Sequence, residues 1–143
     1  MAKGLFWLAL GFLLSSCATT YEVGGNPASI SSRQTASVEA RPGYSGDAAI
    51  RSAITGELRQ RGFRLTESRR KTNDHVAVVY GDTWRWDFVT YILRMEMEFI
   101  DPQTGAIIAD AEYRNSAAHG YAGAETIVRN LFAELDRQGF KNR

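Results

Sequence analysis

The residue best suited to covalent chemistry is Cys17, the only cysteine of the 143 residues. A single thiol cannot form an intramolecular disulfide, a CxxC redox pair or a four-cysteine zinc cluster. Cys17 follows a segment that carries one basic residue, Lys3, then the ten uncharged residues 5–14 and two small residues, which is the order of a signal peptide. The apolar run is too short for a spanning helix, which needs about 20 residues. We therefore expect residues 1–16 to be a signal peptide.

The run Leu14-Ser15-Ser16-Cys17 resembles the lipobox of bacterial lipoproteins. The resemblance implies a diacylglyceryl thioether on Cys17, cleavage before it and acylation of the new amino group, with no other cofactor. Long acyl chains contribute about 0.8 kcal/mol per buried methylene, so the membrane is the first expected partner. In the sorting rule of this family, aspartate after the cysteine retains the protein in the inner membrane. Ala18 therefore indicates the periplasmic face of the outer membrane, with the inner membrane as the alternative.

Groups that could support catalysis are few, and we expect no catalytic or metal site. His75 and His119 lie far apart in sequence without a metal-ligand pattern, and no nucleophile elbow or phosphate-binding glycine motif is present. Glu96 and Asp110 are expected to lie side by side, where one carboxyl pKa could be raised or a cation bound. An enzyme acting on envelope glycans or lipids, the alternative function, would need a pocket at Glu96, Asp110 or His119.

Three aromatic residues, Trp84, Trp86 and Phe88, alternate at strand spacing. They are opposite in phase to the apolar positions of the strand that follows. Either a bulge or turn near Asp87 rotates them into the core, or they form an exposed patch suited to a protein, a glycan or a membrane interface. We take them as the candidate partner-binding residues.

The basic run Arg69-Arg70-Lys71 lies in an expected turn, where it is either simply solvated or in contact with lipid phosphates or another anionic surface near the anchor. The whole chain has 17 basic and 16 acidic side chains and a formal charge of +1. This balance lacks the basic excess of most nucleic-acid binders, so no nucleic acid is expected as a partner.

The elements that must position these residues follow from hydrophobic spacing. Apolar residues recur at helical spacing over 47–61 and 124–138, each ending in a Gly-Phe pair typical of a C-terminal cap, and Ser45 or Asp47 is suited to cap the first helix. Strands are expected at 34–40, 63–66, 76–80, 89–100 and 106–114. Residues 17–32 are expected to be the lipidated N-terminus and a flexible tether, and 33–143 a single domain. The prediction is an α+β fold: a two-layer α/β sandwich in the order β-α-β-β-β-β-α, with two helices on one face of a mostly antiparallel sheet.

The last two strands are expected to form a hairpin around the turn 101–105. Pairing Ile100 with Ala106 places odd-numbered apolar residues on the core face and leaves Ile92 and Ile108 on the outer face. Because a slip of one residue would turn an apolar set outward, this parity is well determined.

This element order behind a lipobox resembles small envelope lipoproteins, including the lipoprotein of lipopolysaccharide transport and the N-terminal domain of TolB. The resemblance implies a non-catalytic binding or accessory role in an envelope protein complex. A structural lipoprotein that self-associates through its sheet face or edge is a further alternative, and the sequence leaves the oligomeric state open.

Overall fold

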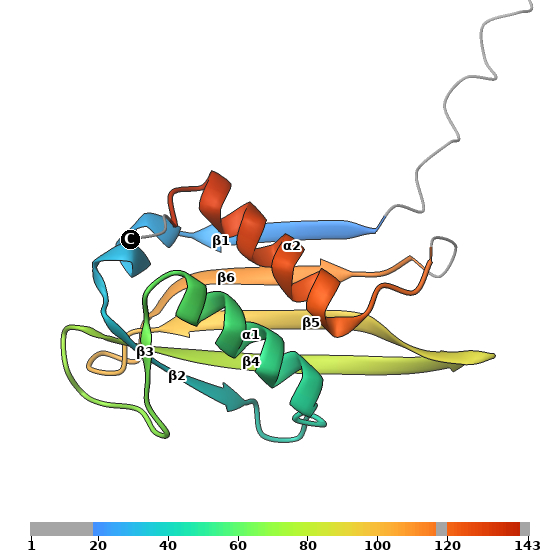
Figure 1. Ribbon diagram of the computed structural model, residues 1–143, viewed down its shortest axis with the longest axis horizontal. Coiled ribbons are helices and arrows are strands. Elements are labelled where there is room, and N and C mark those ends of the chain that lie inside the picture. The colour runs from blue at the N-terminus through green and yellow to red at the C-terminus, as the bar shows by residue number, and fades with distance from the viewer. Residues whose placement is uncertain (1–18, 117–119, 141–143) are drawn as a thin grey trace, which may run out of the picture.

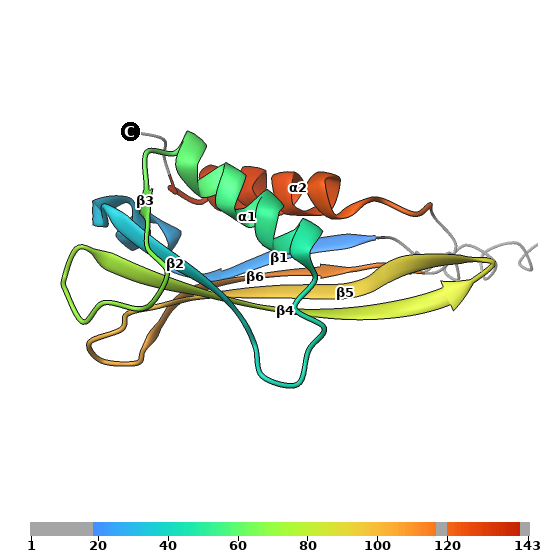
Figure 2. The same cartoon turned by 60° about the horizontal axis from the view of Figure 1, so that its bottom comes forward.

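The computed structural model describes residues 19–116 and 120–140, so the predicted signal peptide, Cys17 and His119 lie outside the described residues. Two helices lie on one face of a six-stranded sheet whose strand order is β1-β6-β5-β4-β2-β3 (Figures 1 and 2). Strand β2 is parallel to β3 and β4, and the remaining pairs are antiparallel. The predicted α+β sandwich is confirmed. The elements are β1 (Thr20–Gly25), the 3-10 helix η1 (Pro27–Ser32), β2 (Thr35–Ala40), α1 (Ala48–Gln60), β3 (Arg64–Leu65), β4 (His75–Asp87), β5 (Val89–Ile100), β6 (Ile107–Arg114) and α2 (Ala124–Arg137).

The helix ends follow from their capping residues. The Asp47 carboxylate accepts hydrogen bonds from the backbone N–H groups of Ala49 and Ile50, which satisfies two donors that have no partner within α1. Gly62 and Gly139, which follow the helices, have φ angles of +83° and +104°, a left-handed conformation that favours glycine. Both helices therefore begin and end close to the predicted positions.

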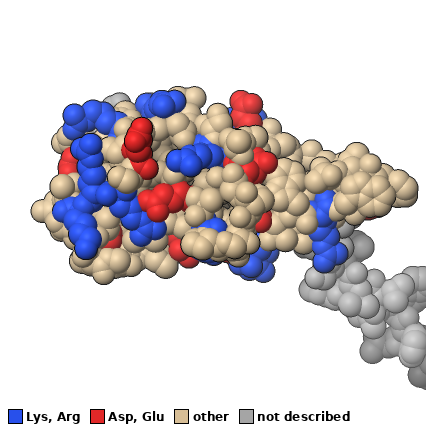
Figure 3. Space-filling view, turned by 90° about the horizontal axis from the view of Figure 1, so that it is seen from below, with Lys and Arg blue, Asp and Glu red and all other residues tan. Residues whose placement is uncertain are grey.

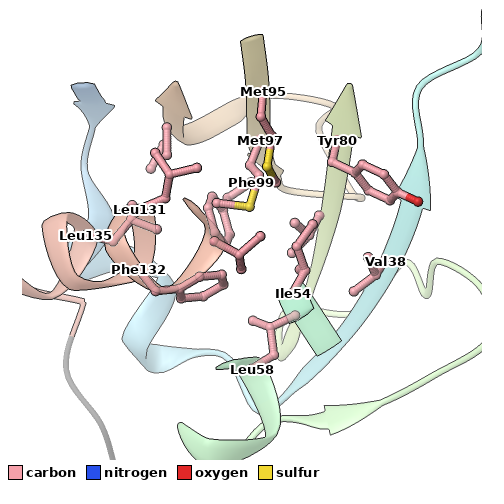
Figure 4. Close-up of a cluster of buried hydrophobic side chains, with 14 of the residues drawn as sticks. Val38, Ile54, Leu58, Tyr80, Met95, Met97, Phe99, Leu131, Phe132 and Leu135 are labelled. Atoms are coloured by element: carbon pink, nitrogen blue, oxygen red, sulfur yellow. The ribbon is translucent and has the colours of Figure 1, made fainter. Parts of the chain in front are cut away.

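The core lies between the helices and the sheet (Figure 4). Side chains from both helices pack on the odd-numbered residues of β5 and on neighbouring strands, and all of those that follow are at most 5% exposed. They include Ile54, Leu58, Leu131, Phe132, Leu135, Met95, Met97, Phe99, Val38 and Tyr80.

The flexible tether predicted over residues 17–32 is wrong for the described part. Thr20–Gly25 forms the edge strand β1 against β6, with Tyr21 and Val23 packed on the core. Ile30 in η1 is fully buried. The segment folds because Ile30 is buried and Tyr21 and Val23 are partly buried, and this burial offsets the entropy lost when the chain is ordered.

The predicted β5–β6 register has the correct parity but is shifted by two residues. Phe99 pairs with Ala109 rather than Ile107, and Glu96 pairs with Glu112 rather than Asp110. A register irregularity next to Ile100 absorbs the extra residue at the turn. Ile108, predicted to be exposed, is therefore partly buried against the core.

Candidate functional site

The β4–β5 hairpin extends beyond the other strands of the sheet, and we call its residues 84–92 the hairpin arm (Figures 1 and 2). Strand β4 continues seven residues past the predicted end at Tyr80, to Asp87. Asp87 pairs with Val89, so only Phe88 makes the turn. Phe88 has φ +61°, the only positive φ of a non-glycine residue in the described chain. A bulky side chain in this conformation is strained.

A bulge at the base of the arm decides which side chains point into the core. The pairing passes from Thr83–Arg94 to Trp84–Ile92, which leaves Leu93 without a partner in the ladder. The phase of β5 therefore reverses, and Ile92, predicted to lie on the outer face, is only 2% exposed. Trp84 is partly buried against the core.

The end of the arm is apolar and exposed. Trp86 is 73% exposed, Phe88 90% and Val89 44%, and we call these three residues the hairpin tip. The rings of Trp86 and Phe88 lie 6.0 Å apart, between centroids. Trp84 thus joins the core while Trp86 and Phe88 form an exposed surface, and the bulge lies at Leu93 rather than near Asp87.

The arm is held at its base by a buried carboxylate. Asp82 is 5% exposed, and its Oδ2 accepts hydrogen bonds from the Trp84 indole Nε1–H at 2.5 Å and from the Ser45 hydroxyl. Across the hairpin, Tyr91 is buried and its ring lies 5.1 Å from that of Tyr121, in the segment before α2. These contacts fix the direction in which the tip projects. They involve residues far apart in sequence, so periodicity gave no sign of them.

The outer face of the sheet carries interleaved arginines and carboxylates (Figure 3). Arg41 pairs with Glu96 and with Glu98, the latter at 2.7 Å, while Arg94 bridges Glu96 and Glu112. Arg94 and Arg114 lower the pKa of Glu112, chiefly through the Arg114 hydrogen bond. The predicted Glu96–Asp110 adjacency does not form, since Asp110 pairs with Glu98. Glu96, Glu98 and Glu112 thus each form an ion pair with at least one arginine.

The basic run Arg69-Arg70-Lys71 is exposed and precedes β4, at the end of the sheet opposite the hairpin arm. Arg69 pairs with Glu39 at 3.0 Å. From Thr83, at the base of the arm, to His75 is eight residues of strand, or about 26 Å. The basic run therefore lies far from the end of the sheet at which Thr20 begins β1.

His75 is fully buried, with Nδ1 2.9 Å from the Thr35 hydroxyl and Nε2 3.2 Å from that of Ser37. Burial lowers its pKa because it disfavours the imidazolium. Within residues 19–116 and 120–140, no three His, Cys, Asp or Glu side chains cluster as metal ligands would.

Two shallow grooves lie on the helix side. One is lined by Tyr21 and Asn130, and the other lies between α1 and α2 and is lined by Gly56 and Gly123. Neither is lined by Glu96 or Asp110, where the enzymatic alternative requires a pocket. No helix in the described part of the chain is long and apolar enough to cross a membrane.

Comparison with known proteins identifies the fold. No family model matches the sequence, and no curated protein matches it. Two crystal structures of PelC from Paraburkholderia phytofirmans, both described as dodecamers, are similar to this chain. One is 17% identical with a TM-score of 0.57 and the other 15% identical with a TM-score of 0.58, and both matches cover 88% of this chain and 100% of PelC. A PDZ domain protein from Parabacteroides distasonis matches with a TM-score of 0.46 at 10% identity, over 72% of this chain and 32% of its own length.

Proposed function

We propose that this chain is a lipid-anchored, non-catalytic binding or accessory module of the bacterial cell envelope, attached through Cys17 to the periplasmic face of the outer membrane. The observation that carries the proposal is the position of the folded domain relative to the lipobox. Strand β1 begins at Thr20, only three residues after Cys17. Three residues span at most about 10 Å, so an acylated Cys17 keeps this end of the sheet at the membrane surface.

The outer sheet face supports a non-catalytic role. A general acid needs a carboxyl group whose pKa is raised toward neutrality. The arginines beside Glu112 lower the pKa of its carboxyl group instead, and Glu96 contacts both Arg41 and Arg94. These ion pairs suit a surface that keeps its charge and shape.

A second candidate function is self-association. It is favoured by the descriptions of the two PelC structures as dodecamers, since these share the fold. Among the described strands, β1 lies at an edge of the sheet and pairs with β6 alone, which leaves backbone groups on its other side for a second chain. In this case the chain forms the accessory assembly by itself.

The test compares the full precursor with its Cys17→Ala variant, expressed in a lipoprotein-producing bacterium. We expect the mature wild-type chain to begin at Cys17, to carry the mass of the acyl groups and to fractionate with the outer membrane. The variant is expected to lack this modification. A wild-type chain without an acyl group on Cys17 would refute the anchor.

Crosslinking in cells then separates the two candidates. Capture of one specific envelope protein by the wild type supports an accessory subunit of a larger complex. Capture of further copies of this chain alone supports self-association. Crosslinks to neither would exclude both forms of assembly.

A further inference from the structure

We propose that the hairpin tip, Trp86, Phe88 and Val89, inserts into the interface of the same bilayer that holds the lipid on Cys17. The inference rests on the proposed anchor and names a second contact between the domain and the membrane. The tip would thereby fix the orientation of the domain, which a lipid on a single residue leaves free to rotate.

The sheet register places both contacts at one end of the molecule. Thr20 pairs with Arg114, Arg114 with Arg94 and Arg94 with Thr83, so these four residues form one row across the sheet. From this row, β1 leads back to Cys17 and β4 leads on to Phe88. In Figure 1, the start of β1 and the arm point to the same side.

The lengths of the two segments, from Thr20 back to Cys17 and from Thr83 on to Phe88, allow both to reach one membrane. Cys17 lies three residues beyond Thr20 and can extend about 10 Å past the row. Phe88 lies five residues beyond Thr83, which at about 3.3 Å per residue is about 17 Å along a straight strand. The row spans about three strand spacings, so Thr20 and Thr83 lie about 14 Å apart across the sheet. If the strands stand upright on the membrane, the anchored residue lies at the surface and the tip enters it by several ångströms.

The tip has the side chains of an interfacial contact. Tryptophan is enriched where membrane and water meet, because its ring is amphipathic. Phe88 is 90% exposed although its φ of +61° would suit glycine or asparagine better. The strain of this left-handed residue outweighs the small burial of its ring in the isolated fold, whereas insertion to a depth of about 5–10 Å would bury the ring.

The charge of the arm's end suits binding to a bilayer whether its lipid headgroups are neutral or anionic. The two exposed charged residues of the arm's end, Arg85 and Asp87, have opposite signs, so the end has no net charge. Binding driven by apolar burial changes little with salt or anionic lipid, whereas a polybasic contact would depend on both. Tyr121, 53% exposed and in contact with Tyr91 in the arm, adds a second amphipathic ring at the same end.

The experiment uses the full-length lipoprotein purified from membranes and reconstituted into phosphatidylcholine vesicles that contain brominated lipids, which quench tryptophan on contact. The wild type is compared with Trp86→Phe, which keeps an aromatic ring at the tip but removes this fluorophore. We expect quenching in the wild type, strongest for bromines close to the headgroup, and loss of that quenched component in Trp86→Phe. Phe88→Asn should reduce the quenching of Trp86, because the tip then has one fewer apolar ring to hold it in the bilayer.

The matched control is Ile107→Asn. Ile107 is also an exposed apolar residue, at 54%, but it lies at the far end of β6, toward the β5–β6 turn. This variant is expected to leave quenching unchanged, as is replacing a third of the phosphatidylcholine with phosphatidylglycerol.

Mass spectrometry of the same preparation distinguishes the two proposals. If Cys17 carries no acyl group, the proposed anchor fails. If Cys17 is acylated and Trp86 remains unquenched with emission typical of water, the tip does not touch the bilayer and the present inference is wrong. If Trp86 is unquenched but its emission is shifted to the blue, another protein surface covers the tip, which also overturns the inference.

Discussion

Replacing Phe88 with asparagine is expected to stabilise the fold, although it removes an aromatic ring. A left-handed backbone conformation costs a residue other than glycine or asparagine about 1 kcal/mol. Phe88 is 90% exposed, so it contributes only about 20 Å² of burial, or about 0.5 kcal/mol at 25 cal/mol per Å². The balance predicts an increase of about 0.5 kcal/mol in the free energy of unfolding.

Phe88→Ala provides the contrast, because alanine keeps the left-handed strain and loses the ring. We expect this variant to be about 0.5 kcal/mol less stable than the wild type, which places it about 1 kcal/mol below Phe88→Asn. Urea denaturation of the chain beginning at Ala18, followed by circular dichroism, measures both differences. If the alanine variant is as stable as the asparagine variant, the argument that Phe88 is strained for the sake of a contact is refuted.

Three further predictions concern the rest of the domain. Arg61, 6% exposed, pairs with Glu57 at 2.5 Å and Asp136 at 2.7 Å, so Arg61→Ala should lower the free energy of unfolding by about 3 kcal/mol, measured by urea denaturation; a loss below about 1 kcal/mol would contradict this. Arg69→Ala, which removes an exposed ion pair, should cost less than about 1 kcal/mol in the same assay. Because burial lowers the pKa of His75, its protonation favours the unfolded chain, so stability should fall as the pH drops below about 6.5. This loss of stability at low pH should be smaller in His75→Gln. Equal pH profiles for the wild type and the variant would contradict the assignment of the effect to His75.

The helices could be predicted from sequence because their signals are local. The apolar spacing of 47–61, the capping carboxylate of Asp47 and the glycine at 62 all lie within one segment, and each agrees with the others. The core face of β5 was predictable for the same reason, since parity depends only on alternation.

Strand β1 could not be predicted in this way. Its residues, Thr20–Gly25, contain two glycines, and its stability comes from pairing with β6, some 90 positions later in the chain. The predicted register of β5 and β6 was wrong for a related reason. An irregularity at Ile100 adds a residue to one strand, and such a residue has no local sequence signature.

The candidate site lies where the β4–β5 hairpin extends beyond the other strands of the sheet. Trp84 continues the even-numbered core face of β4, in which Val78 and Tyr80 pair with Phe99 and Met97 of β5. The bulge at Leu93 shifts β5 by one residue, so that Ile92 pairs with Trp84 and both side chains pack against the core at the base of the arm. Trp86 and Phe88 lie beyond this point and are exposed, so these two rings must remain in water or contact something outside the domain. Alternation along β4 alone does not show where the hairpin passes beyond the core, because Trp84 and Trp86 have the same phase and only Trp84 packs against it. The apolar side chains beyond that point are the ones to test for binding.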